Sequence, residues 1–250
     1  MSGPDLNEAI LAALMLAISA LYASVGNAGA SGYLAAMSLF GMAPETMKPA
    51  ALALNIVVAS ISSYKYLRAG LFSWYVFLPA ALPSVPLAYI GGHAALPEYI
   101  YKPLVGAFLL YSAYMLIRSM SFPSVTNTVP PSLPLLAVSG SLIGLLSGLT
   151  GVGGGIFLSP LLILMGWAEP RQTSGVASLF ILVNSAAALL GTLGAGATLS
   201  PVTPLWIAAV GLGGFAGAEL GSKHLQPAVI KTLLSALLLI AGAKMTIAAF

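Results

Sequence analysis

A short glycine-rich segment occurs twice in the sequence, and its backbone could bind a small anion. The first copy runs from Gly26 to Gly32 and the second from Gly151 to Gly155. Adding 125 to the numbers of the first copy gives the second copy, and this offset is half of the 250 residues. Glycine lets the backbone unwind and approach a ligand, and amide groups at a helix start carry partial positive charge. The pattern therefore predicts two helix starts that face each other and bind an oxyanion.

Polar side chains near the two copies are further candidates for substrate binding. Ser and Thr often bond back to their own helix, and any single glycine could instead allow close helix packing. Asn55 and Asn184 lie within apolar stretches, where an amide can equally lock one helix to another. Arg171 begins an apolar stretch and could contact the anion, with anchoring at the membrane surface as the alternative. The predicted substrate-binding residues are Gly26, Asn27, Gly29, Ser31, Asn55, Gly151, Gly153, Gly154, Gly155, Arg171, Ser178 and Asn184.

The composition indicates a protein whose solvent is mostly the lipid bilayer. Hydrophobic residues make up 59% of the chain and charged residues only 6%, against about 25% charged in a typical soluble domain. The net charge of +3 is scattered along the chain, which argues against nucleic acid as a partner. There is no cysteine, and neither of the two histidines lies in an acidic cluster, so we expect no metal or other cofactor. No nucleophile–base pair is evident either, which argues against an enzyme.

We predict an all-α polytopic membrane protein with about ten transmembrane segments in two inverted five-segment repeats. A helix needs about 20 apolar residues to cross the hydrocarbon core. Residues 28–40 and 154–165 are shorter and follow the glycine copies, so we expect short or broken helices near the midplane. Return to the side of origin is the alternative for both. The apolar segments are roughly residues 6–25, 28–40, 47–67, 72–90, 99–117, 133–149, 154–165, 173–193, 204–220 and 228–250.

The distribution of lysine and arginine favours ten crossings. Ten crossings place six of the nine cations on one side, whereas return of the two short segments divides them four against five. Since cytoplasmic loops carry an excess of Lys and Arg, ten crossings fit better and put both termini outside the cytoplasm. The six are Lys65, Arg68, Arg118, Arg171, Lys223 and Lys231, and the other three are Lys48, Lys102 and Lys244.

The predicted organisation has three parts. Residues 1–118 form the first transmembrane repeat, residues 119–134 a cytoplasmic linker rich in Ser, Thr and Pro, and residues 135–250 the second repeat. Five crossings per repeat turn the second repeat upside down relative to the first, as in many secondary transporters.

The second half carries a motif that resembles a known family. The motif consists of Gly148 to Ile156 (GLTGVGGGI), Pro160, Gly166 and the stretch from Thr173 to Ser178. It is similar to the TauE/SafE sulfite exporter family, also called the toluene-sulfonate uptake permease family, and the resemblance covers nearly the whole chain. The resemblance implies a secondary transporter in the cytoplasmic (inner) membrane of a prokaryote. Its substrate would be a small anion such as sulfite or an organosulfonate, moved by alternating access.

The first half departs from the family pattern, because Asn27 and Ser31 stand in a less glycine-rich run. We expect the selectivity of this protein to lie there. An anion channel or uniporter with the same inverted-repeat fold is the alternative function. The sequence leaves open whether a proton or a sodium ion is coupled to transport and whether the protein forms a homo-oligomer. Glu219 could carry a proton, with pairing to Lys223 at the membrane edge as the alternative.

Overall fold

The computed structural model describes residues 6–118, 128–223 and 228–247, and these residues form ten α-helices and no strand. This confirms the all-helical prediction. The helices are α1 (Leu6–Ala23), α2 (Ala30–Leu39), α3 (Pro44–Arg68), α4 (Trp74–His93), α5 (Glu98–Arg118), α6 (Leu133–Thr150), α7 (Gly155–Leu164), α8 (Pro170–Gly194), α9 (Thr203–Lys223) and α10 (Ala228–Ile247).

Six described helices are long and apolar enough to cross a membrane: α1, α3, α4, α6, α8 and α9. The helices α2 and α7 have 10 residues each, so each rises about 15 Å, half of a hydrocarbon core of about 30 Å. The two short helices that the spacing predicts are therefore present. The crossing of all ten segments in an inverted repeat stays a prediction.

The two halves have matching helices in the same order. The lengths in the first half are 18, 10, 25, 20 and 21 residues, and in the second half 18, 10, 25, 21 and 20. Both 25-residue helices, α3 and α8, begin with a proline. Glycines with positive φ also recur at an offset of 125, in the pairs Gly26 and Gly151, Gly29 and Gly154, and Gly41 and Gly166.

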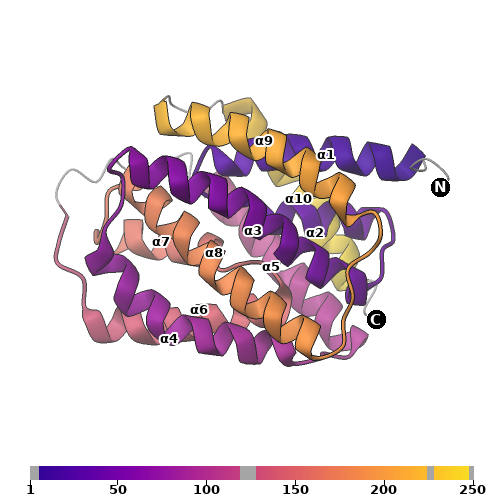
Figure 1. Cartoon of the computed structure of the whole chain (residues 1–250), viewed down its shortest axis with the longest axis horizontal. Helices are drawn as coiled ribbons and strands as arrows, with labels where there is room; N and C mark the ends of the chain where they lie inside the picture. The colour runs from indigo at the N-terminus through magenta and orange to yellow at the C-terminus, as the bar shows by residue number, and fades with distance from the viewer. Residues whose placement is uncertain (1–5, 119–127, 224–227, 248–250) are drawn as a thin grey trace.

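The halves interlock in space (Figure 1). Along one edge of the bundle α1 lies beside α9, and along the opposite edge α4 lies beside α6, with α3 and α8 packed together between them. The first helix of each half thus packs on the fourth helix of the other half. The most extensive helix–helix contacts are therefore those between the two halves.

Glycines let the two edge pairs approach backbone to backbone. On α6, glycines four residues apart face carbonyl groups of α4, and a Cβ at any of them would overlap a carbonyl oxygen. On α9, a second row of glycines faces α1 in the same way. Small residues at this spacing are typical of helix pairs in membranes. The two rows are Gly140, Gly144 and Gly148 against Ala80, Ser84 and Ala88, and Gly213, Gly217 and Gly221 against Leu16, Ala20 and Ser24.

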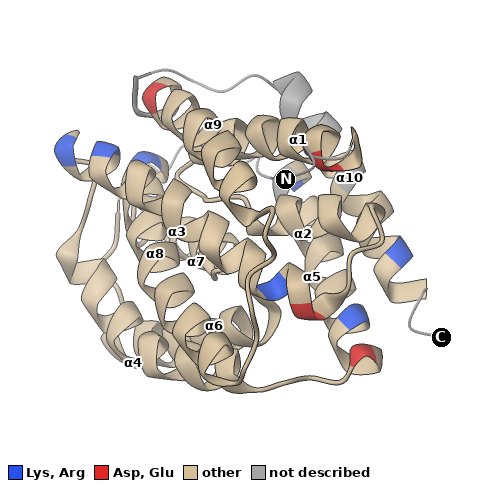
Figure 2. Ribbon diagram, turned by 45° about the vertical axis from the view of Figure 1, so that its right-hand side comes forward, with Lys and Arg blue, Asp and Glu red and all other residues tan. Residues whose placement is uncertain are grey.

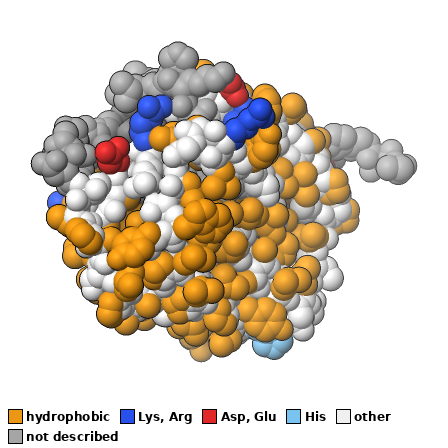
Figure 3. Space-filling view, turned by 60° about the vertical axis from the view of Figure 1, so that its left-hand side comes forward, with side chains coloured by type: hydrophobic (Ala, Val, Ile, Leu, Met, Phe, Trp, Pro, Cys, Tyr) orange, Lys and Arg blue, Asp and Glu red, His pale blue; other side chains and the backbone are white. Residues whose placement is uncertain are grey.

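Charged residues lie at the ends of the helices, as Figure 2 shows. Lys65 forms an ion pair with Glu219, and Arg68 lies one turn further along α3. The expected partner of Glu219, Lys223, has a side chain outside the described residues. At the other end of α3, buried Lys48 donates hydrogen bonds to the carbonyl groups of Gly91, Gly92 and Ala94, where α4 ends. Apolar side chains cover most of the face seen in Figure 3, with charges along one edge.

The glycine rows generate a stability prediction. Gly217→Ala should lower the melting temperature of the detergent-solubilised protein, because the new Cβ overlaps the Ala20 carbonyl and overpacking costs about 1–3 kcal/mol. Gly211→Ala is the matched control on the same helix, since its Cβ would lie 3.8 Å from Val57 Cγ1. Alanine is favoured over glycine inside a helix by about 1 kcal/mol, so the control should be neutral or slightly stabilised. Equal melting temperatures would contradict the close contact of α1 and α9.

Candidate functional site

The two glycine-rich loops meet beside the middle of α8. Asn27 of the first loop lies against Gly155 of the second, where an added Cβ would be 2.6 Å from Asn27 Oδ1. Ile181, eleven residues after the first residue of the 25-residue α8, also contacts Gly155. A small cavity lies at this junction. It is lined by Tyr22, Asn27, Ala28, Gly29, Ala30, Ser31, Val152, Ile156 and Ile181.

Each loop ends at the start of a short helix. Gly29 precedes α2 with φ of 103°, and Gly154 precedes α7 with φ of 82°. As glycines, neither residue has a side chain that could accept a hydrogen bond from the first amide groups of its helix. The first amide groups of a helix have no acceptor within the helix, and together they attract anions. Residues of both helix starts line the cavity: Ala30 and Ser31 of α2 and Ile156 of α7.

Hydrogen bonds from three helices hold the first loop. Tyr22 on α1 bonds to Ser31 on α2, with 2.6 Å between the two oxygens. The Tyr33 hydroxyl donates to the Ala28 carbonyl, and Ser178 on α8 donates to the Gly26 carbonyl at 2.8 Å. The loop is therefore fixed by α1, α2 and α8 together.

Asn27 presents a polar group that the loop itself does not use. Its Oδ1 is buried and has no hydrogen-bond partner among the described residues. A side-chain amide carries one acceptor end, Oδ1, and one donor end, Nδ2. Among the described residues that line the cavity, Asn27 is thus the one with a buried side-chain polar atom that the protein leaves unbonded.

Asn55 on α3 holds the second loop. Its Nδ2 lies 3.4 Å from the Val152 carbonyl oxygen and 3.3 Å from Ser185 Oγ. Gly153 packs directly on the same amide, and an added Cβ would be 2.5 Å from Nδ2. Tyr101 supports the loop from α5 by donating to the Thr150 carbonyl at 3.1 Å. Asn55 thus positions the second loop and is not itself part of the cavity wall.

The structure brings most of the predicted site residues together. Asn27, Gly29 and Ser31 line the cavity, and Ser178 and Asn55 each hold one loop. The remaining predicted glycines form the loops and the start of α7: Gly26, Gly151, Gly153, Gly154 and Gly155.

Two predicted residues lie elsewhere. Asn184 accepts a hydrogen bond from Ser84 on α4 at 2.6 Å and donates to the Phe180 carbonyl, so it locks α4 to α8. Arg171 is exposed at the start of α8, close enough to the Tyr66 hydroxyl to interact electrostatically. Neither residue lines the cavity.

Several cavity residues are not among the residues predicted from the sequence. Val152 and Ile156 lie within the glycine motif of the second half but are apolar, so only their position could have indicated them, whereas nothing in the sequence distinguishes Ile181. Tyr22 had a usable signal, because it lies one helical turn before the first glycine copy. Among the described residues there is also no group of three or more metal-ligating side chains.

The chain matches a family model and two curated relatives. The model for the sulfite exporter TauE/SafE family matches residues 11–245. The "Probable membrane transporter protein y4hK" of Sinorhizobium fredii is 40% identical over 242 residues, covering 95% of this chain and 98% of the relative. The "Probable membrane transporter protein MJ0441" of Methanocaldococcus jannaschii is 25% identical over 117 residues, covering 46% of this chain and 43% of the relative. No solved structure matches the chain at a significant level.

A comparison of two glycines tests how tightly the first loop is packed. Gly26 and Gly41 have nearly equal φ values of 73° and 74°, so alanine at either position carries the same left-handed strain of about 1–2 kcal/mol. An added Cβ at Gly26 would overlap the Ser174 carbonyl, whereas nothing lies within 4 Å at Gly41. Gly26→Ala should therefore lower the melting temperature clearly more than Gly41→Ala. Equal melting temperatures of the two variants would contradict the close contact between the first loop and α8.

Proposed function

Because the chain belongs to the sulfite exporter TauE/SafE family, we propose that it is a secondary transporter that moves a small oxyanion by alternating access. It is a membrane transporter and not an enzyme, as the family and the relative from Sinorhizobium fredii indicate. The proposed substrate is sulfite or an organosulfonate. The proposed location is the inner membrane of a prokaryote.

One observation carries the proposal: two equivalent loops from the two halves line a single cavity. Paired glycine-interrupted segments at matching positions are the best sequence indication of a binding site in repeat-built transporters. Non-helical backbone within the hydrocarbon region is tolerated only where it is buried in protein or lines a wet cavity. Both loops are largely buried and contribute residues to the cavity wall, which supports this reading.

The lining of the cavity suits an anion that must be released again. Among the described residues that line it, none is charged. A full positive charge would hold an anion strongly at low dielectric constant. Amide groups at two helix starts, the Asn27 amide and the Ser31 hydroxyl offer only partial charges. Sulfite and sulfonates carry three oxygens, which these donors would share.

The cavity in this structure has room for about one water molecule. Substrate binding therefore requires the two loops to move apart, which fits a carrier that passes through a closed state. We propose that the ten helices cross as two inverted repeats, residues 1–118 and 135–250, with residues 119–134 on the cytoplasmic side. The division of lysine and arginine, six on one side and three on the other, supports this orientation, and the separation of Lys65 and Arg68 from Lys48 at the two ends of α3 supports the crossing of that helix.

Uptake by proteoliposomes tests the proposal. The wild-type protein should take up labelled sulfite or a labelled organosulfonate with a rate that saturates. Asn27→Ala should reduce uptake at low substrate concentration at least about tenfold, because a hydrogen bond to a charged group is worth about 1.5–3 kcal/mol. Gly154→Leu should abolish uptake. Ser141→Ala is the control, since that hydroxyl only bonds back to the Ala137 carbonyl within α6.

Two outcomes would count against a carrier of small anions. Non-saturating currents in a planar bilayer would favour the anion channel. Absence of both flux and thermal stabilisation across sulfite, sulfate, thiosulfate and several organosulfonates would remove small oxyanions as substrates, because a ligand that binds the folded state raises its apparent stability.

A further inference from the structure

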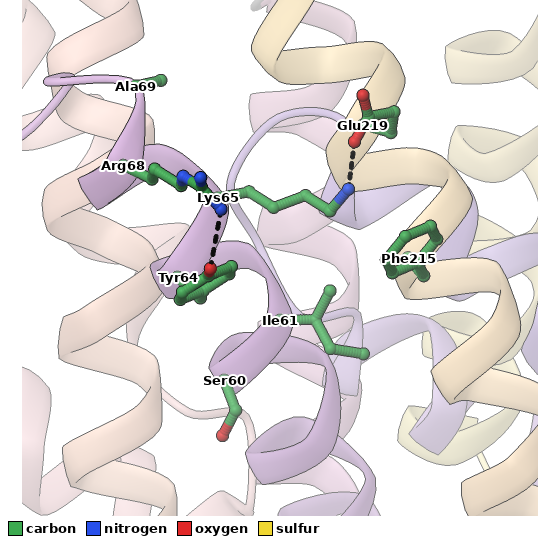
Figure 4. Close-up of a pocket in the computed structure, with 8 residues that line it drawn as sticks. All are labelled: Ser60, Ile61, Tyr64, Lys65, Arg68, Ala69, Phe215 and Glu219. Carbon is green, nitrogen blue, oxygen red and sulfur yellow. Dashed lines mark hydrogen bonds and ion pairs between the residues drawn. The ribbon is translucent and has the colours of Figure 1, made fainter.

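A second hollow lies between α3 and α9, apart from the residues of the glycine loops (Figure 4). It is a groove of about 850 Å³, open on one side. One wall comes from the last turns of α3 and the other from α9, so the two halves of the chain each supply one wall. The residues that line it are Ser60, Ile61, Tyr64, Lys65, Arg68, Ala69, Phe215 and Glu219.

The groove has a cationic end at the end of α3. Lys65 pairs with Glu219 and also lies over the Phe215 ring, with Nζ 3.8 Å from the ring centroid. Arg68 donates one hydrogen bond to the Tyr64 hydroxyl at 3.0 Å. A guanidinium has five N–H donors, so Arg68 keeps donors for a ligand. With two cations and one carboxylate, this end carries a net positive charge.

Apart from Ser60, the rest of the groove is lined by apolar and aromatic side chains and faces outward. Tyr64 and Phe215 are 61% and 58% exposed, and neighbouring Leu212 is 68% exposed. Such large apolar side chains on the outside of a membrane-spanning bundle face acyl chains. A soluble anion could use the cationic end of the groove, but it would gain nothing from these walls.

We propose that this groove binds one anionic phospholipid. Its phosphate lies at Arg68 and Lys65, and one acyl chain lies along Ile61 and Phe215. Basic pockets between transmembrane helices are known to accept anionic lipid headgroups, and the end of a spanning helix is the depth at which headgroups lie. Because the walls come from both halves, the bound lipid would stabilise the contact between α3 and α9. This inference does not depend on the transported substrate.

Native mass spectrometry of the full-length protein in mild detergent tests this site. Phosphatidylglycerol and phosphatidylcholine with identical acyl chains are the two probes. The wild-type protein should retain one phosphatidylglycerol in preference to phosphatidylcholine. Arg68→Gln should weaken phosphatidylglycerol binding about fivefold, the amount expected for one cation near an anionic surface. Arg68→Lys should keep most of the binding, because it keeps the charge.

Arg118→Gln is the matched control, since Arg118 is also an exposed arginine at the end of a helix. It should leave lipid binding unchanged. Glycerol 3-phosphate should not compete, because it lacks the acyl chains; competition at millimolar concentration would reassign the groove to a soluble phosphate. Equal retention of the two lipids by the wild-type protein would overturn the proposal. Equal loss in Arg68→Gln and Arg118→Gln would overturn it as well.

Discussion

Close backbone contact between helices is the constraint on which the rest of this structure depends. Lipid is as apolar as leucine, so helices gain little by burying apolar side chains against each other. The glycines of α6 and α9 instead bring whole backbones together, α6 onto α4 and α9 onto α1. With both edges of the bundle fixed in this way, α3 and α8 are held between them, and they supply Asn55 and Ser178, which hold the two loops.

A second constraint follows from the interrupted helices. The unwound backbone at Gly26 and Gly151 leaves amide and carbonyl groups that lipid cannot satisfy. Ser178, Asn55 and Tyr101 bond to the loop carbonyls, and each comes from a neighbouring helix. Once these bonds are made, the Asn27 amide and the amide groups of two helix starts are left at the cavity. These are the groups that the proposed anion would contact.

Much of the local structure could be predicted from the sequence. Glycine copies at a fixed offset predict the two short helices, because glycine interruptions and apolar length are local properties. The candidate site was predicted only in part. Asn184 and Asn55 look alike in sequence, yet one locks α4 to α8 and the other holds the second loop. Which way a helix faces depends on its neighbours, and an apolar helix in lipid carries no polar stripe that would reveal it. Ile181 was missed for the same reason.

The placement of the two glycine rows distinguishes the two halves of the chain. By helix order α1 corresponds to α6 and α4 to α9, yet the glycine rows lie on α6 in one edge pair and on α9 in the other, with Gly91 of α4 as a further glycine that faces α6. The matching contact positions of α1 and α4 are Leu16, Ala20, Ser24, Ala80, Ser84 and Ala88, none of them glycine. If the first half paired with a copy of itself, α1 would pack on α4 and no glycine would lie at these positions. If the second half did so, α6 would pack on α9 and glycine would face glycine. At these contacts the two halves are therefore complementary and not equivalent.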